Sequence, residues 1–214
     1  MNAGREKSQA ERAYEELERR LVTLELAPGL LLLEQDLVGL LGYGRTPVRE
    51  AVQRLAGQGL LCVYPRKGIQ VAPIEAAAMA QVLEARRVME RLLVVKASER
   101  ADASLRVQMR ALAERLDRVL DDASAFFHLD RQLDELLCRA CGNEFLVQAL
   151  APLHVHCRRL WYLFRAETDT REAARLHAQL ARAVADDSSA GAIGALNGII
   201  SLLESFQERL ASRS

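Results

Sequence analysis

Residues 42–59 limit the possible folds of this chain more than any other segment, because they place a glycine-bearing turn directly before a helix start. The turn brings Arg45, Thr46 and Pro47 to the first helical turn, where proline's missing N–H costs nothing. Arg45 and Arg49 lie four residues apart and therefore share one face of the helix. Another face carries the apolar residues Val48, Val52 and Leu55. A helix with arginines and a hydroxyl at its N-terminal end is suited to the DNA major groove.

The flanking segments predict the rest of a winged helix-turn-helix. A helical apolar pattern covers residues 9–26, and Ala27-Pro28-Gly29 ends it. A short second helix is predicted over Glu34–Leu41, with three side chains buried: Leu37, Leu40 and Leu41. After the helix that carries Arg45, Leu60–Tyr64 and Ile69–Pro73 predict a hairpin around the cationic turn 65–68. This turn would form the tip of the wing.

This pattern resembles the GntR family of bacterial transcriptional regulators over roughly residues 9–73. The motifs that carry the resemblance are Pro28-Gly29-x4-Glu34-x2-Leu37, Gly42-x2-Arg45-Thr46-Pro47-Val48-Arg49-Glu50-Ala51-Val52-x2-Leu55, Gly59-Leu60 and Arg66-Lys67-Gly68-x2-Val71. The resemblance implies DNA contacts by Gln35, Gly44, Arg45, Thr46, Pro47, Arg49, Arg66, Lys67 and Gly68. Gly44 departs from the family, which usually has a capping Ser or Thr there. Glycine caps only slightly worse than serine, so we expect an intact helix with one phosphate contact fewer.

The charge distribution agrees with a sequence-specific DNA reader. The chain has 29 basic and 29 acidic residues, so its formal net charge is zero. Residues 1–74 contain ten basic and nine acidic side chains, but residues 45–67 contain five basic side chains against Glu50 alone. Positive charge is therefore local, whereas a generally cationic surface would bind any duplex.

The second half predicts an all-helical bundle. With only 5 Pro and 12 Gly and a hydrophobic content of 50%, the chain is expected to be mostly α-helical. Helical periodicity predicts six helices near 76–101, 103–122, 124–141, 143–166, 169–187 and 189–211. We therefore predict two domains: residues 1–74 bind DNA, and residues 75–214 form an antiparallel bundle that binds a ligand and dimerises.

This half resembles, more loosely and over nearly all of 79–211, the FCD domain of FadR-type GntR regulators, and its length resembles the VanR-like branch. The motifs are Glu84-Ala85-Arg86-x3-Glu90, Asp130-x2-Leu133-Asp134-x2-Leu137-x2-Ala140-x-Gly142-Asn143 and His177-x2-Leu180-x2-Ala183. In many such domains one Asp and three His hold a divalent metal. Asp130 matches the Asp and His177 the second His. Asp134 stands at the first His, and the third falls near Ile199, or near Asn197 with a two-residue deletion.

The resemblance implies an effector site of Arg86, Asp130, Asp134, His177 and Asn197. One alternative is a divalent metal held by Asp130, Asp134 and His177; otherwise no cofactor is expected, and the polar groups contact a ligand directly or pair with each other. Two buried carboxylates repel unless a cation or proton intervenes. Arg86 is the first candidate cation, with a salt bridge to Glu90 as its alternative, and either Arg158 or Arg159 could reach the pocket or stay in solvent.

The remaining residues favour no catalytic chemistry. No nucleophile stands at motif spacing from a base, and no phosphate-binding loop or dinucleotide fingerprint is present. Cys138-x2-Cys141 is interpreted as packing thiols, with a redox or zinc role as the alternative. The histidines His128, His154 and His156 are predicted to be packing or surface residues. We expect no secretory signal and no membrane span, which favours the cytoplasm.

The combined hypothesis is a cytoplasmic repressor that binds a pseudo-palindromic operator in double-stranded DNA as a homodimer and responds to a small carboxylate. One alternative is a constitutive DNA-binding regulator whose helical half only dimerises. A distant alternative is a metal-dependent enzyme with Asp130, Asp134 and His177 as ligands.

Overall fold

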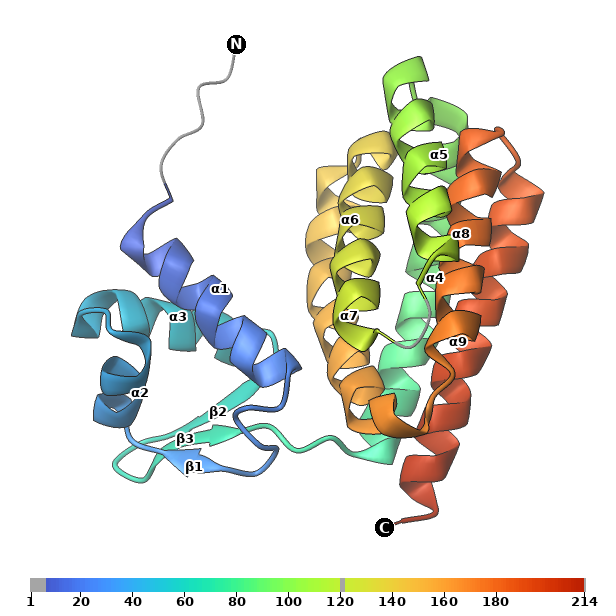
Figure 1. Cartoon of the computed structure of the whole chain (residues 1–214). Coiled ribbons are helices and arrows are strands. Elements are labelled where there is room, and N and C mark those ends of the chain that lie inside the picture. Colours follow the sequence, from blue (N-terminus) through green and yellow to red (C-terminus); the bar gives the residue numbers. More distant parts are fainter. Residues whose placement is uncertain (1–6, 120–121, 214) are drawn as a thin grey trace. The chain divides into compact units, whose positions relative to one another are not determined.

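The computed structural model describes residues 7–119 and 122–213. The chain divides into two compact units, Met1–Ile74 and Glu75–Ser214 (Figure 1). Within the described residues there are nine α-helices and one three-stranded sheet. The predicted class, mostly α with a winged helix-turn-helix followed by a helical bundle, is confirmed.

The first unit contains three helices and the sheet. The helices are α1 (Gln9–Val22), α2 (Glu34–Leu41) and α3 (Arg45–Gly57), and the strands are β1 (Leu31–Leu32), β2 (Leu61–Tyr64) and β3 (Gly68–Val71). The strands pair antiparallel in the order β1-β3-β2, so β3 lies in the middle of the sheet. Helices α1 and α3 pack together over apolar side chains that are fully buried, among them Leu17, Leu21, Val48 and Leu55.

Two expectations for the first unit are wrong. The first helix ends at Val22 instead of continuing to residue 26, because Leu24 adopts a left-handed backbone conformation with φ 58° that a helix cannot contain. Leu40 was expected in the core, but it is 40% exposed. Leu37 and Leu41 are buried as expected, because residues four apart lie on the same face of a helix. Leu40 lies at the edge of that face.

The turn between α2 and α3 depends on its two glycines. Gly42 ends α2 with φ 71°, and its N–H donates to the Val38 carbonyl oxygen. Glycine reaches this left-handed conformation without the strain that a Cβ causes. Gly44 occupies the N-cap position of α3, and no side chain caps that helix end. The turn therefore sets the start of α3 by backbone geometry alone.

The second unit is all-helical within its described residues. Its elements are α4 (Ala76–Arg100), α5 (Ala103–Asp117), α6 (Ala123–Cys141), α7 (Glu144–Phe164), the short 3₁₀ helix η1 (Arg165–Glu167), α8 (Thr170–Ala185) and α9 (Ser189–Ala211). Helix α4 packs against α6, α7 and α9, and α8 packs against α5 and α9. Side-chain caps fix several helix starts: the Asn143 side chain accepts from the Leu146 N–H, and Asp169 accepts from Arg171 and Glu172.

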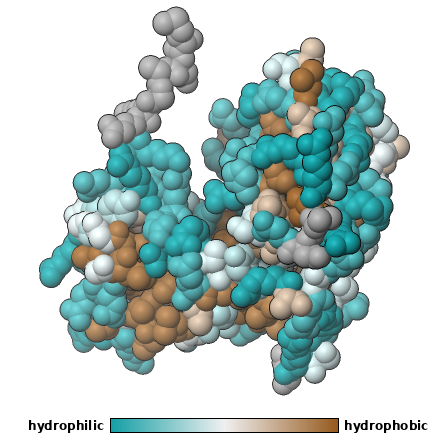
Figure 2. Space-filling view, in the orientation of Figure 1, coloured by the Kyte–Doolittle hydropathy of each residue, from teal (hydrophilic) through white to brown (hydrophobic). Residues whose placement is uncertain are grey.

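Helix α9 is long and apolar enough to cross a membrane by length and composition alone. However, Ile199, Ile200 and Leu203 are buried in the bundle, where α9 packs against α4 and α8 (Figure 1). A core helix of a bundle has the same composition, so α9 is read as part of the core. A separate hydrophobic surface lies over β1 in the first unit, where Leu31 is 55% and Leu33 48% exposed (Figure 2).

Candidate DNA interface and effector pocket

The DNA-contact residues predicted from the sequence lie at the start of α3 and at the hairpin turn. Those with exposed side chains or backbone are Gln35, Gly44, Arg45, Thr46, Arg49, Arg66 and Lys67, whereas Pro47 and Gly68 are half-buried. Arg49 is bound by Glu34 of α2: Nη2 lies 2.8 Å from Oε1 and Nε lies 3.1 Å from Oε2. The hydrogen bond from Arg49, and the more distant charge of Arg45, lower the pKa of Glu34 below its ordinary value.

The wing turn joins β2 and β3 and holds its two cations in solvent. The Lys67 N–H donates to the Tyr64 carbonyl oxygen at 3.0 Å. Arg66 has φ 64° and Gly68 has φ 122°, so both lie in the left-handed half of backbone space. A Cβ on Gly68 would come within 2.7 Å of the Leu32 carbonyl oxygen. Gly68 therefore serves the conformation of the turn and the close approach of β1.

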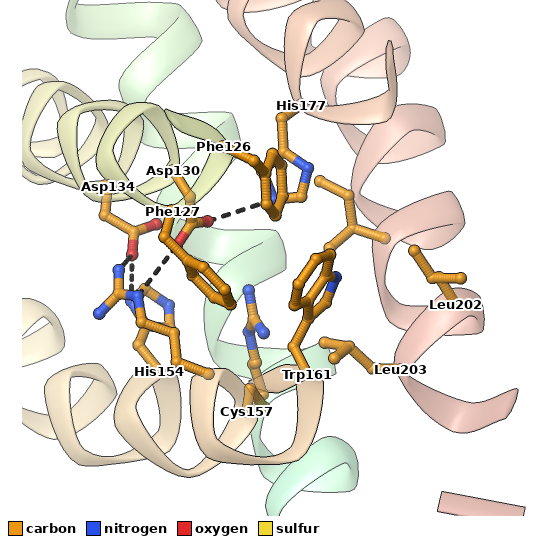
Figure 3. Close-up of a pocket in the computed structure, with 13 residues that line it drawn as sticks. Phe126, Phe127, Asp130, Asp134, His154, Cys157, Trp161, His177, Leu202 and Leu203 are labelled. Atoms are coloured by element: carbon orange, nitrogen blue, oxygen red, sulfur yellow. Dashed lines mark hydrogen bonds and ion pairs between the residues drawn. The ribbon is translucent and has the colours of Figure 1, made fainter. Parts of the chain in front are cut away.

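A cavity of about 30 Å³ lies inside the helical unit (Figure 3). Its polar lining consists of Arg86, Asp130, Asp134, His154, Arg158 and His177, and its aromatic lining of Phe126, Phe127 and Trp161. Four of the five predicted effector residues line it. The exception is Asn197, which is exposed on α9, while Ile199 lines the cavity instead. Two residues turn a helix by about 200°, so the two positions cannot both face inward.

Arg158 of α7 is the cation between the two aspartates of α6. Its Nε lies 2.9 Å from Asp130 Oδ2, and its Nη2 donates to Asp134 Oδ2. His177 of α8 approaches the other oxygen of Asp130, with Nε2 3.2 Å from Oδ1, and its Nδ1 lies 2.7 Å from the Ala173 carbonyl oxygen. Burial alone would raise the pKa of Asp130, but Arg158 and His177 outweigh burial and lower it well below its ordinary value.

Arg86 was the first candidate for the cation between Asp130 and Asp134, but it does not lie between them. It binds Glu90 on its own helix, with Nε 2.5 Å from Oε2 and Nη2 3.2 Å from Oε1. The salt-bridge alternative is therefore present, although Arg86 also lines the cavity. Glu90 engages Nε and Nη2 and leaves Nη1 unengaged by this pair. Burial would lower the pKa of Arg86, but the Glu90 charge outweighs it and raises that pKa.

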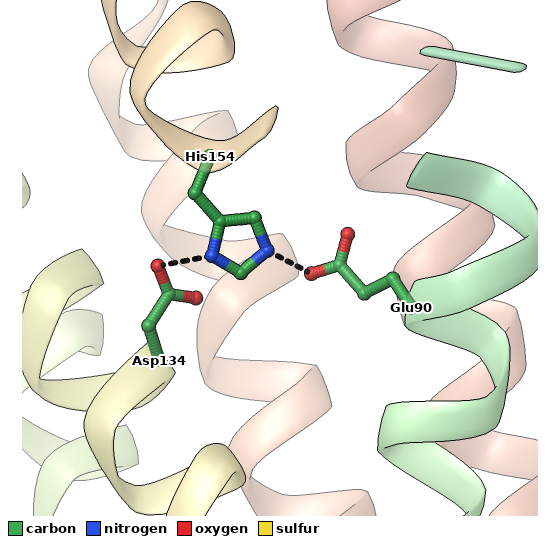
Figure 4. Close-up of side chains that lie close together, drawn as sticks. All are labelled: Glu90, Asp134 and His154. Atoms are coloured by element: carbon green, nitrogen blue, oxygen red, sulfur yellow. Dashed lines mark ion pairs between the residues drawn. The ribbon is translucent and has the colours of Figure 1, made fainter. Parts of the chain in front are cut away.

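His154 of α7 was expected to be a packing or surface residue; it is buried, and it also makes polar contacts that the expectation did not include. The side chain is buried between two carboxylates: Nδ1 lies 3.1 Å from Asp134 Oδ2, and Nε2 lies 3.6 Å from Glu90 Oε1 (Figure 4). Burial alone would lower its pKa, but Asp134 and Glu90 raise the pKa of His154 to about 9. The spacing of His154 and Arg158, four apart on one helix face, was the available signal.

The polar lining residues, together with Glu90, form a continuous series of polar contacts across four helices. It runs Arg86, Glu90, His154, Asp134, Arg158, Asp130 and His177, on α4, α7, α6 and α8. These residues do not fit a divalent metal. Arg158 already binds both aspartates, and Ile199 has no ligand atom. The carboxylates Glu90 and Asp134 lie with His154 in one cluster, but Glu90 is already bound by Arg86 and Asp134 by Arg158.

The cysteine pair at the end of α6 shows no sign of a redox or metal role. Burial, the largest cause, raises the pKa of the Cys138 thiol to about 12. The thiolate is the form that binds metals and attacks disulfides, so its formation is disfavoured here. Cys141 is fully buried in the helix packing.

Comparison with known families identifies the two units. The first matches the model for bacterial regulatory proteins of the gntR family over residues 9–71, and the second matches the FCD domain over residues 81–202. The chain belongs to the GntR family and carries an FCD domain. As a GntR regulator of FCD type, it is a transcriptional regulator and not an enzyme, and DNA binding is implied by its first unit.

Relatives and solved structures agree with this assignment. An uncharacterized HTH-type transcriptional regulator of Streptomyces ambofaciens is 32% identical over 146 residues, which cover 68% of this GntR chain and 62% of that protein. The HTH-type transcriptional repressor RspR of Escherichia coli is 28% identical over 157 residues, covering 70% and 67%. The structure of E. coli McbR/YncC shares the fold, with a TM-score of 0.82 over 95% of this chain and 98% of that one at 20% identity.

Proposed function

We propose that this GntR regulator is a cytoplasmic repressor that binds a pseudo-palindromic operator as a homodimer and releases it when a small organic acid enters the helical unit. The observation that carries the DNA-binding part is the joint exposure of Arg45 and Arg49 at the start of α3. Arginine there can bind guanine in the major groove. RspR, a relative, is named a repressor, which supports the direction of regulation.

Two observations support a homodimer: one recognition helix contacts few base pairs, and α4 has exposed apolar side chains. One recognition helix contacts only a few base pairs, so two are needed for useful specificity. On α4, Val88 is 70% and Leu92 is 45% exposed, and their spacing of four places them on one face. A second copy of the chain that packs on this face would remove both side chains from water.

The effector part is supported by a buried cation and an unmet donor in the cavity lining. Arg86 is 7% exposed and lines the cavity beside its pair with Glu90. Among the described residues, the buried Trp161 Nε1 has no hydrogen-bond acceptor. Buried donors are normally satisfied. A carboxylate oxygen would accept from Trp161 Nε1, and its charge would be opposite to that of Arg86. The aromatic walls suit an acid with an apolar body.

The volume of the cavity sets a condition on this binding. About 30 Å³ holds roughly one or two water molecules, so an organic acid requires side chains to move. Phe127 lines the cavity and stacks on Tyr162 with ring centroids 4.7 Å apart. Phe127 also contacts Trp161 and Phe126, with ring centroids 4.7 and 5.8 Å apart. Phe127 is half-buried, whereas Phe126 and Trp161 are buried, so Phe127 is the aromatic lining residue whose displacement would open the cavity.

The test compares small carboxylates with their primary amides as ligands. Fluorescence anisotropy would measure binding to DNA from the region upstream of the chain's own gene in the presence of each ligand. Thermal unfolding would give the melting temperature of the protein with the same ligands. We expect some carboxylate to raise the melting temperature and weaken DNA binding, while its amide does neither. Equal action of the amide would contradict the carboxylate assignment. No effect of any small molecule on DNA binding would favour the constitutive regulator.

Variants at Arg86 locate the effector. Arg86→Met combined with Glu90→Gln removes both charges of the buried pair together, so that neither is left unpaired. This double variant should bind DNA like the wild type but lose the carboxylate response. Arg139→Met, on an exposed position of α6, is the control and should keep the response. An unchanged response in the double variant would remove Arg86 from the effector site.

A further inference from the structure

We propose that Arg158 is a resident cation that replaces the divalent metal of metal-containing FCD domains. The guanidinium holds Asp130 and Asp134 together and joins α6 to α7. The helical unit of this chain would then keep its structure without a metal. This inference concerns the architecture of the pocket, and it stands whether or not the cavity binds an organic acid.

The geometry places the guanidinium where a metal would have to bind. Arg158 reaches one oxygen of each aspartate, through Nε to Asp130 and through Nη2 to Asp134. The side chains of the three residues are only 15%, 13% and 17% exposed. Two buried carboxylates repel unless a cation or a proton intervenes, and Arg158 supplies the cation. A metal bound to the same two oxygens would have to displace Arg158.

The other lining residues suit a guanidinium better than they suit a metal ion. A guanidinium donates in a fixed planar fork and needs acceptors, whereas a metal needs a shell of ligand atoms from several directions. His177 still contributes Nε2 to Asp130 from α8. On α9, however, the lining residues are the apolar Ile199, Leu202 and Leu203. Helix α9 therefore closes the cavity with hydrocarbon and offers no ligand from its side.

The first experiment compares metal sensitivity in the wild type. The melting temperature of the full-length protein would be measured with a chelator, with Zn²⁺, with Ni²⁺ and with no addition. We expect the four values to agree within about 1 °C. Stabilisation by either ion, or loss of stability with chelator, would overturn the proposal. The measurement needs neither DNA nor effector, so its failure is distinct from a failure of the proposed function.

The second experiment exchanges the resident cation for a metal. Arg158→Met leaves Asp130 and Asp134 without the cation that they share, with only one histidine beside each, and should lower the melting temperature by roughly 5 °C or more. Combining it with Ile199→His supplies an imidazole on α9 opposite Asp130, Asp134 and His177. We expect Zn²⁺ or Ni²⁺ to restore the melting temperature of this double variant. If it unfolds without metal, refolding on addition of the ion is the same readout.

Two control variants make the result specific to Arg158. Ile199→His alone keeps the arginine in place and should gain no stabilisation from metal. Stabilisation equal to that of the double variant would show that Arg158 does not occupy the metal position. Arg158→Met with Asp130→Asn and Asp134→Asn removes all three charges and should melt above the single variant. A triple variant no more stable than Arg158→Met would mean that repulsion between the aspartates is not what Arg158 relieves.

Discussion

Arg49 of α3 donates two hydrogen bonds to Glu34, the first residue of α2, at 2.8 and 3.1 Å. The pair links the two helices of the helix-turn-helix through the side chain that is predicted to read DNA. The Arg49 side chain is 64% and the Glu34 side chain 35% exposed. An ion pair so open to water contributes little to stability, so DNA can take Arg49 from Glu34 at small cost.

The first prediction is that Arg45→Ala and Arg49→Ala each weaken operator binding by roughly 5- to 100-fold, because a bidentate arginine–guanine contact contributes about 1–3 kcal/mol. Titrations at one fixed salt concentration would measure this, with Arg139→Ala on α6 as the control. A loss below about threefold in both variants would contradict the assignment of the two arginines as base-reading residues.

The second prediction concerns Glu34. Glu34→Gln removes a negative charge next to the DNA surface and releases Arg49 from its strongest partner. We expect affinity for unrelated duplex DNA to rise by a few fold, while the preference for operator over unrelated DNA falls. The measurement is a pair of titrations with operator and scrambled duplex. If specificity rises instead, Glu34 does not restrain Arg49 in the free protein.

The third prediction is that Lys67 contacts phosphate at the wing tip. Lys67→Ala should weaken binding to all sequences similarly and reduce the slope of log affinity against log salt by about one. Binding measured at several salt concentrations gives this slope. Lys7→Ala, outside the hairpin, should leave it unchanged. A slope that Lys67→Ala does not alter would place this side chain away from the phosphates.

The fourth prediction addresses the uncapped start of α3. Gly44 has the backbone conformation of an N-cap residue, φ −64° and ψ 167°, and a Cβ there would touch only Pro47, at 3.8 Å. Gly44→Ser should therefore stabilise the first unit by a few tenths of a kcal/mol, whereas Gly44→Ala should destabilise it, because serine caps a helix and alanine does not. Denaturant unfolding of both variants tests the order. Equal stability of the two would show that capping is not limiting here.

The fifth prediction is that the exposed apolar face of α4 is a dimer contact. Leu92→Glu should shift the protein towards monomer and weaken operator binding, since a charge would be buried against the second copy. Light scattering coupled to size-exclusion chromatography measures the mass. Val107→Glu, at a 64% exposed position on α5, is the matched control. A dimer that persists in the Leu92 variant would move the interface elsewhere.

The fold could be predicted from the sequence because its signals are local. The turn glycine Gly42, the cap Asn143 and the apolar periodicity of the helices act within a few residues, and they fixed most element ends. The left-handed residue Leu24 broke this pattern, since leucine gives no local sign of a positive φ. Helix ends that depend on such single backbone conformations cannot be obtained from periodicity.

The pocket was only partly predictable because the side chains that bind each other in it come from different helices. The motif positions Asp130, Asp134 and His177 do line the cavity. Which arginine stands between the aspartates depends on how α7 is rotated against α6, which no spacing within one helix reveals. The same rotation buries His154 beside Asp134. On α9, the choice between residues 197 and 199 depended on an assumed deletion and not on a physical signal.

The short strand β1 has a consequence for how any regulatory signal reaches DNA. It pairs Leu31 and Leu32 with Gln70 and Ile69 of β3, and the Gly29 N–H donates to the Val71 carbonyl oxygen. Main-chain hydrogen bonds thus connect the segment before α2 to the wing. Wing tip and reading helix therefore belong to the same compact unit, Met1–Ile74. On the proposed function, we expect induction to change the position or spacing of whole reading heads, and an operator with altered half-site spacing should select the induced form.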